Sequence, residues 1–295
     1  ASDVYKRQVC LVTLAFKIER DVPRCTGGRD GSCLSNAQID VISRLYQGPI
    51  NSRGQVLYAS QPYDPGMLGD DWAQWKFSAS IGSTSESSVR ELPVNERDPI
   101  AVGLIFQVPP QADVTQRPQA FAFNYDFDLD PAKLSATNSI YQESALDFMP
   151  TPSAQQMHTL QQRGGKVLLV HGTADAVFSV DATTDWYQLL RAQYKDKTAD
   201  FARFFRVPGM NHSDGGLATD QFDALSALVR WVEYGEPPNR IVAHVRGYGN
   251  SARVNDELPM DWSPERSRPL CPYPQIARYN GHGDSERAES FSCRP

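Results

Sequence analysis

The pattern of apolar and polar positions changes character near Gly164. Residues 163–172, RGGKVLLVHG, form an apolar run of strand length bounded by glycines, which is typical of a buried strand in a parallel sheet. A polar loop follows, and then a helical pattern over residues 181–194. A second apolar run covers residues 201–207, and another helical pattern covers residues 220–234. This alternation of strand and helix predicts an α/β arrangement.

The first half of the chain is less regular. Residues 34–48, LSNAQIDVISRLYQG, predict a helix that begins after Ser35 as N-cap and ends at Gly48. From residue 49 to about residue 118 the sequence is rich in prolines, glycines and serines, which is typical of a lid or cap. The stretch FAFNYDF, residues 121–127, alternates like a half-buried strand.

His212 follows the second predicted strand, in the loop PGMNHSDGG. Loops carried by rigid strands often hold catalytic side chains, although a structural or capping histidine fits the same position. Asp175 follows the first predicted strand in the same way. In an open α/β sheet, functional residues gather at the carboxyl ends of the strands. The shared position therefore favours a functional pair.

An acid after one strand and a histidine after the next match the last part of the α/β-hydrolase order, nucleophile, acid, histidine. The histidine takes the proton of a serine hydroxyl, and the acid fixes the imidazole tautomer. Asp181 and Asp185 are alternatives to Asp175 as the acid. We expect Asp181 to cap the next helix and Asp185 to lie inside it, facing away. The other interpretation of Asp175 is a solvated loop aspartate.

Composition excludes two classes of partner. The formal net charge is −6, the sequence pI is about 5.4, and no long basic run is present, which argues against a nucleic-acid surface. No apolar stretch approaches the roughly 18 to 20 residues that span a bilayer. The run VCLVTLAF, residues 9–16, is short and is followed by charges. We expect neither a nucleic acid nor a membrane as partner.

The cysteines predict two local disulfides. Cys25 and Cys33 flank a polar, glycine-rich loop, and Cys271 and Cys293 enclose the C-terminal tail. Neither pair has the spacing of zinc ligands, and no histidine cluster completes a site, so we expect no metal. Buried free thiols are the alternative. Disulfides indicate an oxidising compartment, either secreted or periplasmic, and they leave Cys10 as the odd cysteine.

Several motifs together resemble the tannase and feruloyl esterase family of α/β-hydrolases. They are KVLLVHGTADAVFS, FFRVPGMNH followed by GG and FDAL, and the ending RPLCPYPQIARYNGHGD…FSCR. CLSNAQIDVISRLYQGP resembles part of the family's lid domain. The resemblance covers most of the chain. It implies an irregular α+β lid domain over residues 1–150 and the C-terminal part of the α/β-hydrolase catalytic domain over residues 151–295.

Within this resemblance the family's acid corresponds to Asp175 and its general base to His212. The family's lid and tail disulfides correspond to the pairs already expected from spacing, Cys25–Cys33 and Cys271–Cys293. The residue after the family's histidine is commonly a cysteine that bridges to the cysteine before the nucleophilic serine. Ser213 stands there in this chain, so that bridge cannot form.

The family's nucleophile is absent from the sequence. It belongs to a Gly-Cys-Ser-x-Gly-Gly elbow upstream of the lid, and neither this motif nor G-x-S-x-G occurs here. The serines of GSCLS and IGSTSESS lack the preceding strand and following helix of such an elbow. We therefore expect the chain to begin inside the lid, incomplete at its N-terminus, with Cys10 separated from its partner. The first residues, ASDVYKRQ, resemble a translated sequencing adaptor. The family's calcium loop would also lie upstream, so no cofactor is expected.

Three aromatic residues are candidates for substrate binding. Phe178 lies in the same loop as Asp175 and is a candidate wall of an aromatic acyl pocket, with a core position as the alternative. Trp72 and Trp75 lie among polar residues, where aromatic side chains line a cleft or pin a lid to the core. We expect His171, at the end of the first predicted strand, to be architectural.

The acid–histidine pair predicts a hydrolase, and the family resemblance implies a serine carboxylesterase for esters of aromatic acids, such as feruloyl or galloyl esters. We expect the chain to be inactive without the missing serine. The expected partner is a small aromatic ester, and the oligomeric state stays open. The alternative is a non-catalytic protein that binds aromatic ligands and retains the hydrolase fold.

Overall fold

The computed structural model describes residues 17–27, 31–78 and 94–295. Cys10 lies outside these residues. The chain divides into two compact units, which are considered separately. The first unit comprises Ala1–Gln47, Ser60–Trp72 and Ala154–Pro295, and the second comprises Gly48–Ala59 and Ala73–Ser153. This division by compactness differs from the expected domains 1–150 and 151–295, which remain a prediction about the roles of the two parts.

The first unit contains the α/β elements. Its helices are α3 (Ile18–Asp21), α4 (Asn36–Gln47), η1 (Pro65–Leu68), α5 (Asp70–Ala73), which runs one residue into the second unit, α9 (His158–Gln162), α10 (Val180–Tyr194), η6 (Lys195–Asp200), α11 (Ala224–Tyr234) and η7 (Ala288–Ser290). Its strands are β1 (Val167–Gly172), β2 (Ala202–Val207), β3 (Gln221–Phe222), β4 (Ile241–His244), β5 (Ser267–Leu270), β6 (Ile276–Tyr279) and β7 (Phe291–Arg294).

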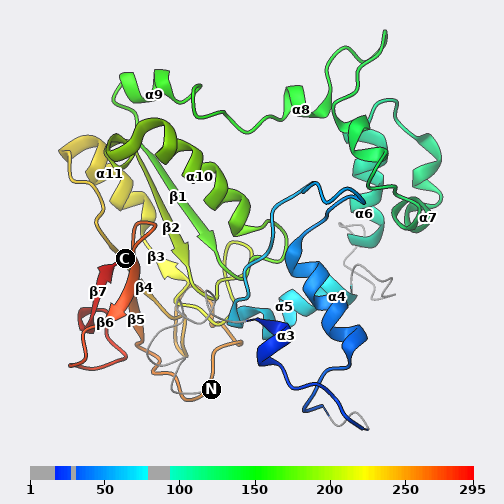
Figure 1. Ribbon diagram of the computed structural model, residues 1–295. Coiled ribbons are helices and arrows are strands. Elements are labelled where there is room, and N and C mark those ends of the chain that lie inside the picture. Colours follow the sequence, from blue (N-terminus) through cyan, green and yellow to red (C-terminus); the bar gives the residue numbers. More distant parts are fainter. Residues whose placement is uncertain (1–16, 28–30, 79–93) are drawn as a thin grey trace. The chain divides into compact units, whose positions relative to one another are not determined.

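Strands β1 and β2 form a parallel pair, as predicted, in register from Val167 opposite Ala202 to Gly172 opposite Val207. Figure 1 shows them side by side between α10 and α11. Because side chains alternate along a strand, successive residues of β1 enter two different cores. One core joins Val167 and Leu169 to α10. The other joins Leu168 and Val170 to residues that include Ala227 of α11.

The helices that flank β1 and β2 have N-caps other than those the sequence suggested. Ser179 is the N-cap of α10, and its hydroxyl accepts the N–H of Asp181 at 3.0 Å. The prediction that Asp181 caps this helix is therefore wrong. Its carboxylate instead accepts a hydrogen bond from the Ser60 hydroxyl at 2.8 Å. The helix expected from residue 220 begins only after Asp223, its N-cap, because residues 221–222 pair with β4 as strand β3.

The predicted N-terminal helix is confirmed as α4. Ser35 and Gln38 cap it reciprocally: the N–H of Gln38 donates to the Ser35 hydroxyl, and the N–H of Ser35 donates to the Gln38 side chain. The helix ends before Gly48, whose φ of +78° is a left-handed conformation that glycine adopts readily.

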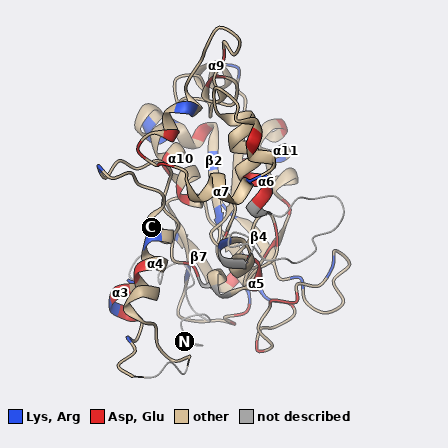
Figure 2. Ribbon diagram, turned by 90° about the vertical axis from the view of Figure 1, so that its right-hand side faces the viewer, with Lys and Arg blue, Asp and Glu red and all other residues tan. Residues whose placement is uncertain are grey.

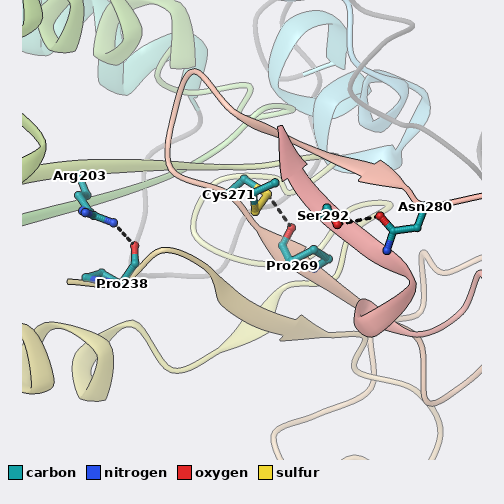
Figure 3. Close-up of a disulfide and its surroundings, with 7 residues drawn as sticks. Arg203, Pro238, Pro269, Cys271, Asn280 and Ser292 are labelled. Carbon is teal, nitrogen blue, oxygen red and sulfur yellow. Dashed lines mark hydrogen bonds between the residues drawn. A yellow bond between two sulfur atoms is a disulfide. The ribbon is translucent and has the colours of Figure 1, made fainter. Parts of the chain in front are cut away.

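Strands β3, β4 and β5 form an antiparallel sheet, and β6 and β7 form a separate antiparallel pair in the tail. Cys271, directly after β5, is disulfide-bonded to Cys293 of β7, with 5.4 Å between the Cα atoms (Figure 3). Cys25 and Cys33 form the second disulfide, with 5.0 Å between the Cα atoms. Both predicted pairings are confirmed. The prediction that Cys10 is unpaired lies outside the described residues.

The described residues of the second unit form helices and one isolated β-bridge, between Ile50 and Val56. The helices are η2 (Gln74–Ser78), α6 (Val94–Ala101), η3 (Val102–Phe106), η4 (Ala112–Thr115), α7 (Pro118–Phe123), η5 (Asp130–Leu134) and α8 (Ala145–Phe148). The predicted strand over residues 121–127 is wrong. Pro118 favours a helix start, and the Asp126 carboxylate accepts the N–H of Asp128 in a turn, so the run is divided between α7 and that turn.

Acidic and basic residues are interspersed along the helices (Figure 2). Helix α10, for example, carries Asp181, Asp185 and Arg191. Within the described ranges, no helix combines the length and the apolar character needed to cross a bilayer.

Candidate active site

The site lies where β1 and β2 end. Gly172 and Val207 are partners in the last register position of the parallel pair, so the loops that follow them start side by side. These loops bring Asp175 and His212 together. The Nδ1 atom of His212 lies 2.9 Å from Oδ2 of Asp175. This is a hydrogen-bonding distance, as an acid that orients a general base requires.

Both carboxylate oxygens of Asp175 accept hydrogen bonds. Oδ1 accepts the backbone N–H groups of Val177 and Phe178 at 2.8 and 2.9 Å, which closes a tight turn around the side chain. Oδ2 faces both His212 and Nε2 of His171, which lies 3.1 Å away. The residue is only 4% exposed. The interpretation of Asp175 as a solvated loop residue is therefore wrong.

The pKa of Asp175 reflects this environment. Burial alone would raise it, because a charged carboxylate loses hydration. The hydrogen bonds from His171, His212 and the amides of Phe178 and Val177 outweigh burial and lower the pKa to about 2. Asp175 is therefore ionised at neutral pH, as the acid of a triad must be to stabilise an imidazolium.

The loop that carries His212 is stabilised by a β-bridge within it and by two carboxylates that follow it in the sequence. Met210 and Gly216 form an isolated β-bridge. The carboxylate Oε1 of Glu257 accepts the side-chain N–H of Asn211 and the backbone N–H of Gly216, each at 3.0 Å. Oδ2 of Asp220 accepts the N–H of Gly215 at 2.7 Å.

Close backbone contact also fixes this loop against β1. A Cβ atom on Gly172 would lie 2.2 Å from the carbonyl oxygen of Met210, so a glycine is needed where the loop passes the strand end. Ser213, which stands where the family commonly has cysteine, has a φ of +74°. Sequence reasoning missed the roles of Asp220 and Glu257. No local pattern marks Glu257, whose partners Asn211 and Gly216 lie 46 and 41 residues away, and the contact of Asp220 with Gly215 depends on how the loop folds back.

The ring of Phe178 lies beside His212, with 5.4 Å between ring centroids and an interplanar angle of 59°. Phe178 is 57% exposed, so its alternative interpretation as a core aromatic is wrong. The His212 side chain is 43% exposed. No hydrogen bond joins its Nε2 to any residue that the structure describes. The face of the imidazole opposite Asp175 is therefore available for chemistry.

The two candidate tryptophans differ. Trp72 is buried and stacks on Tyr46, with 5.3 Å between ring centroids. Trp72 is thus packed inside the first unit, and a substrate-binding role for it stays a prediction. Trp75 belongs to the second unit, where the Arg97 guanidinium lies 5.2 Å from its ring centroid. A substrate-binding role for Trp75 stays a prediction.

Among the described residues, no serine hydroxyl is hydrogen-bonded to His212. Ser35 of the GSCLS motif serves as the cap of α4, and IGSTSESS, residues 81–88, lies outside the described residues. Over the same described ranges, no group of three His, Cys, Asp or Glu side chains could hold a metal ion. The expectation that the family's calcium loop belongs upstream stays a prediction. The remaining histidines are exposed: His158, His244 and His282.

The parallel pair with its flanking helices, and the acid–histidine pair at the strand ends, define an α/β-hydrolase-type protein. The family model "Tannase and feruloyl esterase" matches residues 4–294. The chain belongs to the tannase and feruloyl esterase family.

Individual relatives agree with this assignment. The chain is 38% identical to the mono(2-hydroxyethyl) terephthalate hydrolase of Piscinibacter sakaiensis, over 92% of this chain and 43% of that protein. Two solved structures share the fold. Feruloyl esterase B from Aspergillus oryzae has a TM-score of 0.56 at 22% identity, over 94% of this chain and 50% of that one. The tannin acyl hydrolase from Aspergillus niger has a TM-score of 0.53 at 17% identity, over 96% and 48%. The chain thus spans about half the length of these relatives.

Proposed function

We propose that this chain supplies the acid and the general base of a serine carboxylesterase. The observation that carries the proposal is the 2.9 Å contact between Asp175 Oδ2 and His212 Nδ1 at the adjacent ends of two parallel strands. A buried carboxylate that faces one ring nitrogen holds the proton on that nitrogen. The other nitrogen, Nε2, is then left with a lone pair that accepts a proton.

In the proposed reaction, Nε2 of His212 takes the proton of a serine hydroxyl as the oxygen attacks the ester carbonyl. The imidazolium, stabilised by ionised Asp175, returns the proton to the leaving alcohol, and an acyl-enzyme remains. A water molecule, activated by the same nitrogen, then releases the acid. The nucleophilic serine belongs to an elbow outside these 295 residues, since the sequence contains no such motif.

We propose an ester of an aromatic acid as the substrate. The exposed ring of Phe178, 5.4 Å from the His212 ring, offers a face on which an aromatic acyl group stacks at the reacting end. The names of relatives, a mono(2-hydroxyethyl) terephthalate hydrolase and a feruloyl esterase, support the same chemical class. The two disulfides favour a secreted or periplasmic location.

The test compares the 295-residue chain with a longer protein that includes the coding sequence upstream of it in the gene. Both are assayed with methyl ferulate, methyl gallate and mono(2-hydroxyethyl) terephthalate, and both are treated with a serine-directed phosphonate. We expect hydrolysis and labelling for the longer protein only. His212→Ala and Asp175→Ala should each lower its kcat by a factor of at least about 1000.

Two outcomes would contradict the proposal. Phosphonate labelling of a serine within the 295 residues would show that the nucleophile is present after all. A longer protein that binds methyl ferulate without hydrolysing it would favour the non-catalytic alternative.

A further inference from the structure

His171 makes three side-chain contacts within the candidate site. It is the residue before the last of β1, and its side chain is only 14% exposed. Its Nε2 atom lies 3.1 Å from Oδ2 of Asp175 and also 3.1 Å from the carbonyl oxygen of Phe178. Its Nδ1 atom lies 2.9 Å from the hydroxyl of Thr183 in α10. The ring therefore links β1, the acid loop and a helix.

These contacts determine the tautomer of His171. A carbonyl oxygen and an ionised carboxylate are acceptors only, so Nε2 must carry a proton. In the neutral ring, Nδ1 then accepts a hydrogen bond from the Thr183 hydroxyl. For His212 the same reasoning places the proton on Nδ1, because that nitrogen faces the same carboxylate oxygen. The two histidines thus approach one oxygen with opposite tautomers.

We propose that His171 is a positioning residue that acts through Asp175 to hold His212 in the Nδ1–H tautomer. Its Nε2–H fixes the direction of Oδ2, and its bond to the Phe178 carbonyl holds the loop that bears both the acid and the aromatic ring. The catalytic meaning of this role rests on the proposed esterase function. The effect on the tautomer does not.

Two further observations support the assignment. The hydrogen bond from His171 is the largest of the interactions that lower the pKa of Asp175 against the effect of burial. In addition, Oδ1 is already occupied by two backbone N–H groups, so the carboxylate is held at both oxygens. Removal of His171 would leave Oδ2 with His212 as its remaining partner among the described residues.

The test uses imidazole ¹⁵N spectra of the ¹⁵N-labelled 295-residue chain near pH 8, without ester. The wild type should show His171 in the Nε2–H form and His212 in the Nδ1–H form. In His171→Phe, which keeps a ring but loses the donor, the His212 signals should change to the average of both tautomers. The titration midpoint of the Asp175 carboxylate, followed by ¹³C, should rise by about one pH unit.

Two further variants separate positioning from packing. In His171→Gln the side-chain amide places N–H donors close to the position of Nε2, so the Nδ1–H form of His212 should be restored. Thr183→Val removes the contact on the other side of the ring and should leave the tautomer of His212 unchanged.

An Nδ1–H tautomer of His171 in the wild type would overturn the proposal, and that result needs no variant to fold. An unchanged His212 spectrum in a folded His171→Phe chain would also overturn it. Neither readout involves hydrolysis, so these outcomes are independent of whether the longer protein is an esterase. In that longer protein, His171→Phe should lower kcat more than it changes KM, with His171→Gln recovering most of the loss.

Discussion

At the scale of single residues, Asp175 shows how one side chain can organise a site. Four donors share its two oxygens, two backbone amides on Oδ1 and two imidazoles on Oδ2. Such a carboxylate is stable only as an anion, because a proton on either oxygen would displace one of these donors. Its low pKa reflects these hydrogen bonds, which outweigh the opposing effect of burial.

Replacement of Asp175 by Asn should make stability less dependent on pH in the acid range. The folded pKa of about 2 lies below the ordinary value of 3.8, so the ionised group stabilises the folded chain above that ordinary value. The stabilisation is lost as the pH falls through 2. The shift corresponds to about 2 kcal/mol. Urea unfolding from pH 7 to pH 2 should show the wild type exceeding Asp175→Asn by at least this amount at pH 7, with a difference that shrinks below pH 4.

Asp185→Asn is a matched control, since Asp185 lies exposed on α10 and should follow the wild-type curve. A gap between wild type and Asp175→Asn that stays constant down to pH 2 would mean that the carboxylate charge does not stabilise the fold.

The sequence was enough to predict the two central residues of the site. It did not predict the residues that hold their loops in place. Asp175 and His212 follow apolar runs directly, so the strand-end rule for α/β sheets locates them. Glu257 acts through a tertiary contact that no spacing indicates, and the short-range contact of Asp220 with Gly215 appears only once the loop has folded. His171 could be recognised at a strand end, but its bond to Asp175 depends on how the loop folds back over β1.

At the scale of elements, the loop after β2 is the part that must be rigid for His212 to be useful. Its glycines increase its backbone freedom. Because Ser213 stands where the family commonly has a cysteine, no disulfide can restrain the loop at that position. Half-buried Glu257 and buried Asn255 provide the constraint. Glu257 accepts two N–H groups of the loop, and Asn255 donates to the Gly216 carbonyl at 2.8 Å. Hydrogen bonds to charged, buried groups are among the stronger ones.

Glu257→Ala should loosen this loop, because it leaves the N–H groups of Asn211 and Gly216 buried without an acceptor. We expect a loss of about 1 to 3 kcal/mol in the free energy of unfolding and faster hydrogen exchange at the Gly216 amide. Glu257→Gln keeps one carbonyl oxygen and should lose less. Glu233→Ala, at an exposed position on α11, is the control. Equal hydrogen exchange at the Gly216 amide in all three variants would show that the hydrogen bonds of Glu257 do not hold the loop.

Secondary structure was predictable where one pattern dominated. The two apolar runs of the parallel pair and the capped helix α4 satisfy both the local preference and the final packing. The prediction of a strand over residues 121–127 was wrong. Its apolar residues alternate with a period of two, but Pro118 starts a helix. Phe123 is 80% exposed, so no buried face exists to enforce a strand there.

At the scale of the whole chain, compactness and sequence order do not coincide. Residues 60–72 belong to the first unit although they lie between parts of the second. The buried Asp64 explains this, because its carboxylate accepts hydrogen bonds from the Thr173 hydroxyl and from the Gly66 amide. A contact between residues 109 positions apart cannot be anticipated from the sequence pattern, and the boundary at residue 150 that the family resemblance implied does not take it into account.

The tail is tied to the site through β2. Directly after Cys271, the N–H of Tyr273 donates to the carbonyl of Phe204 at 2.7 Å, and Pro272 forms a bridge with Phe205. The disulfide between Cys271 and Cys293 anchors this segment to β7. The tail thus supports the strand that leads into the His212 loop.

Loss of the tail disulfide should therefore affect both stability and this edge of β2. The bond closes a loop with a sequence separation of 22, for which chain entropy predicts about 3 kcal/mol of stabilisation. We expect Cys271→Ser with Cys293→Ser to lower the free energy of unfolding in urea by about this amount and to speed hydrogen exchange at the Tyr273 amide.

The control is the double variant Cys25→Ser with Cys33→Ser, which removes the disulfide that closes a shorter loop, with a separation of 8. It should lower the free energy of unfolding by about 2 kcal/mol and leave hydrogen exchange at the Tyr273 amide unchanged. If both double variants change exchange at Tyr273 equally, the tail disulfide stabilises the chain only globally and does not specifically support β2.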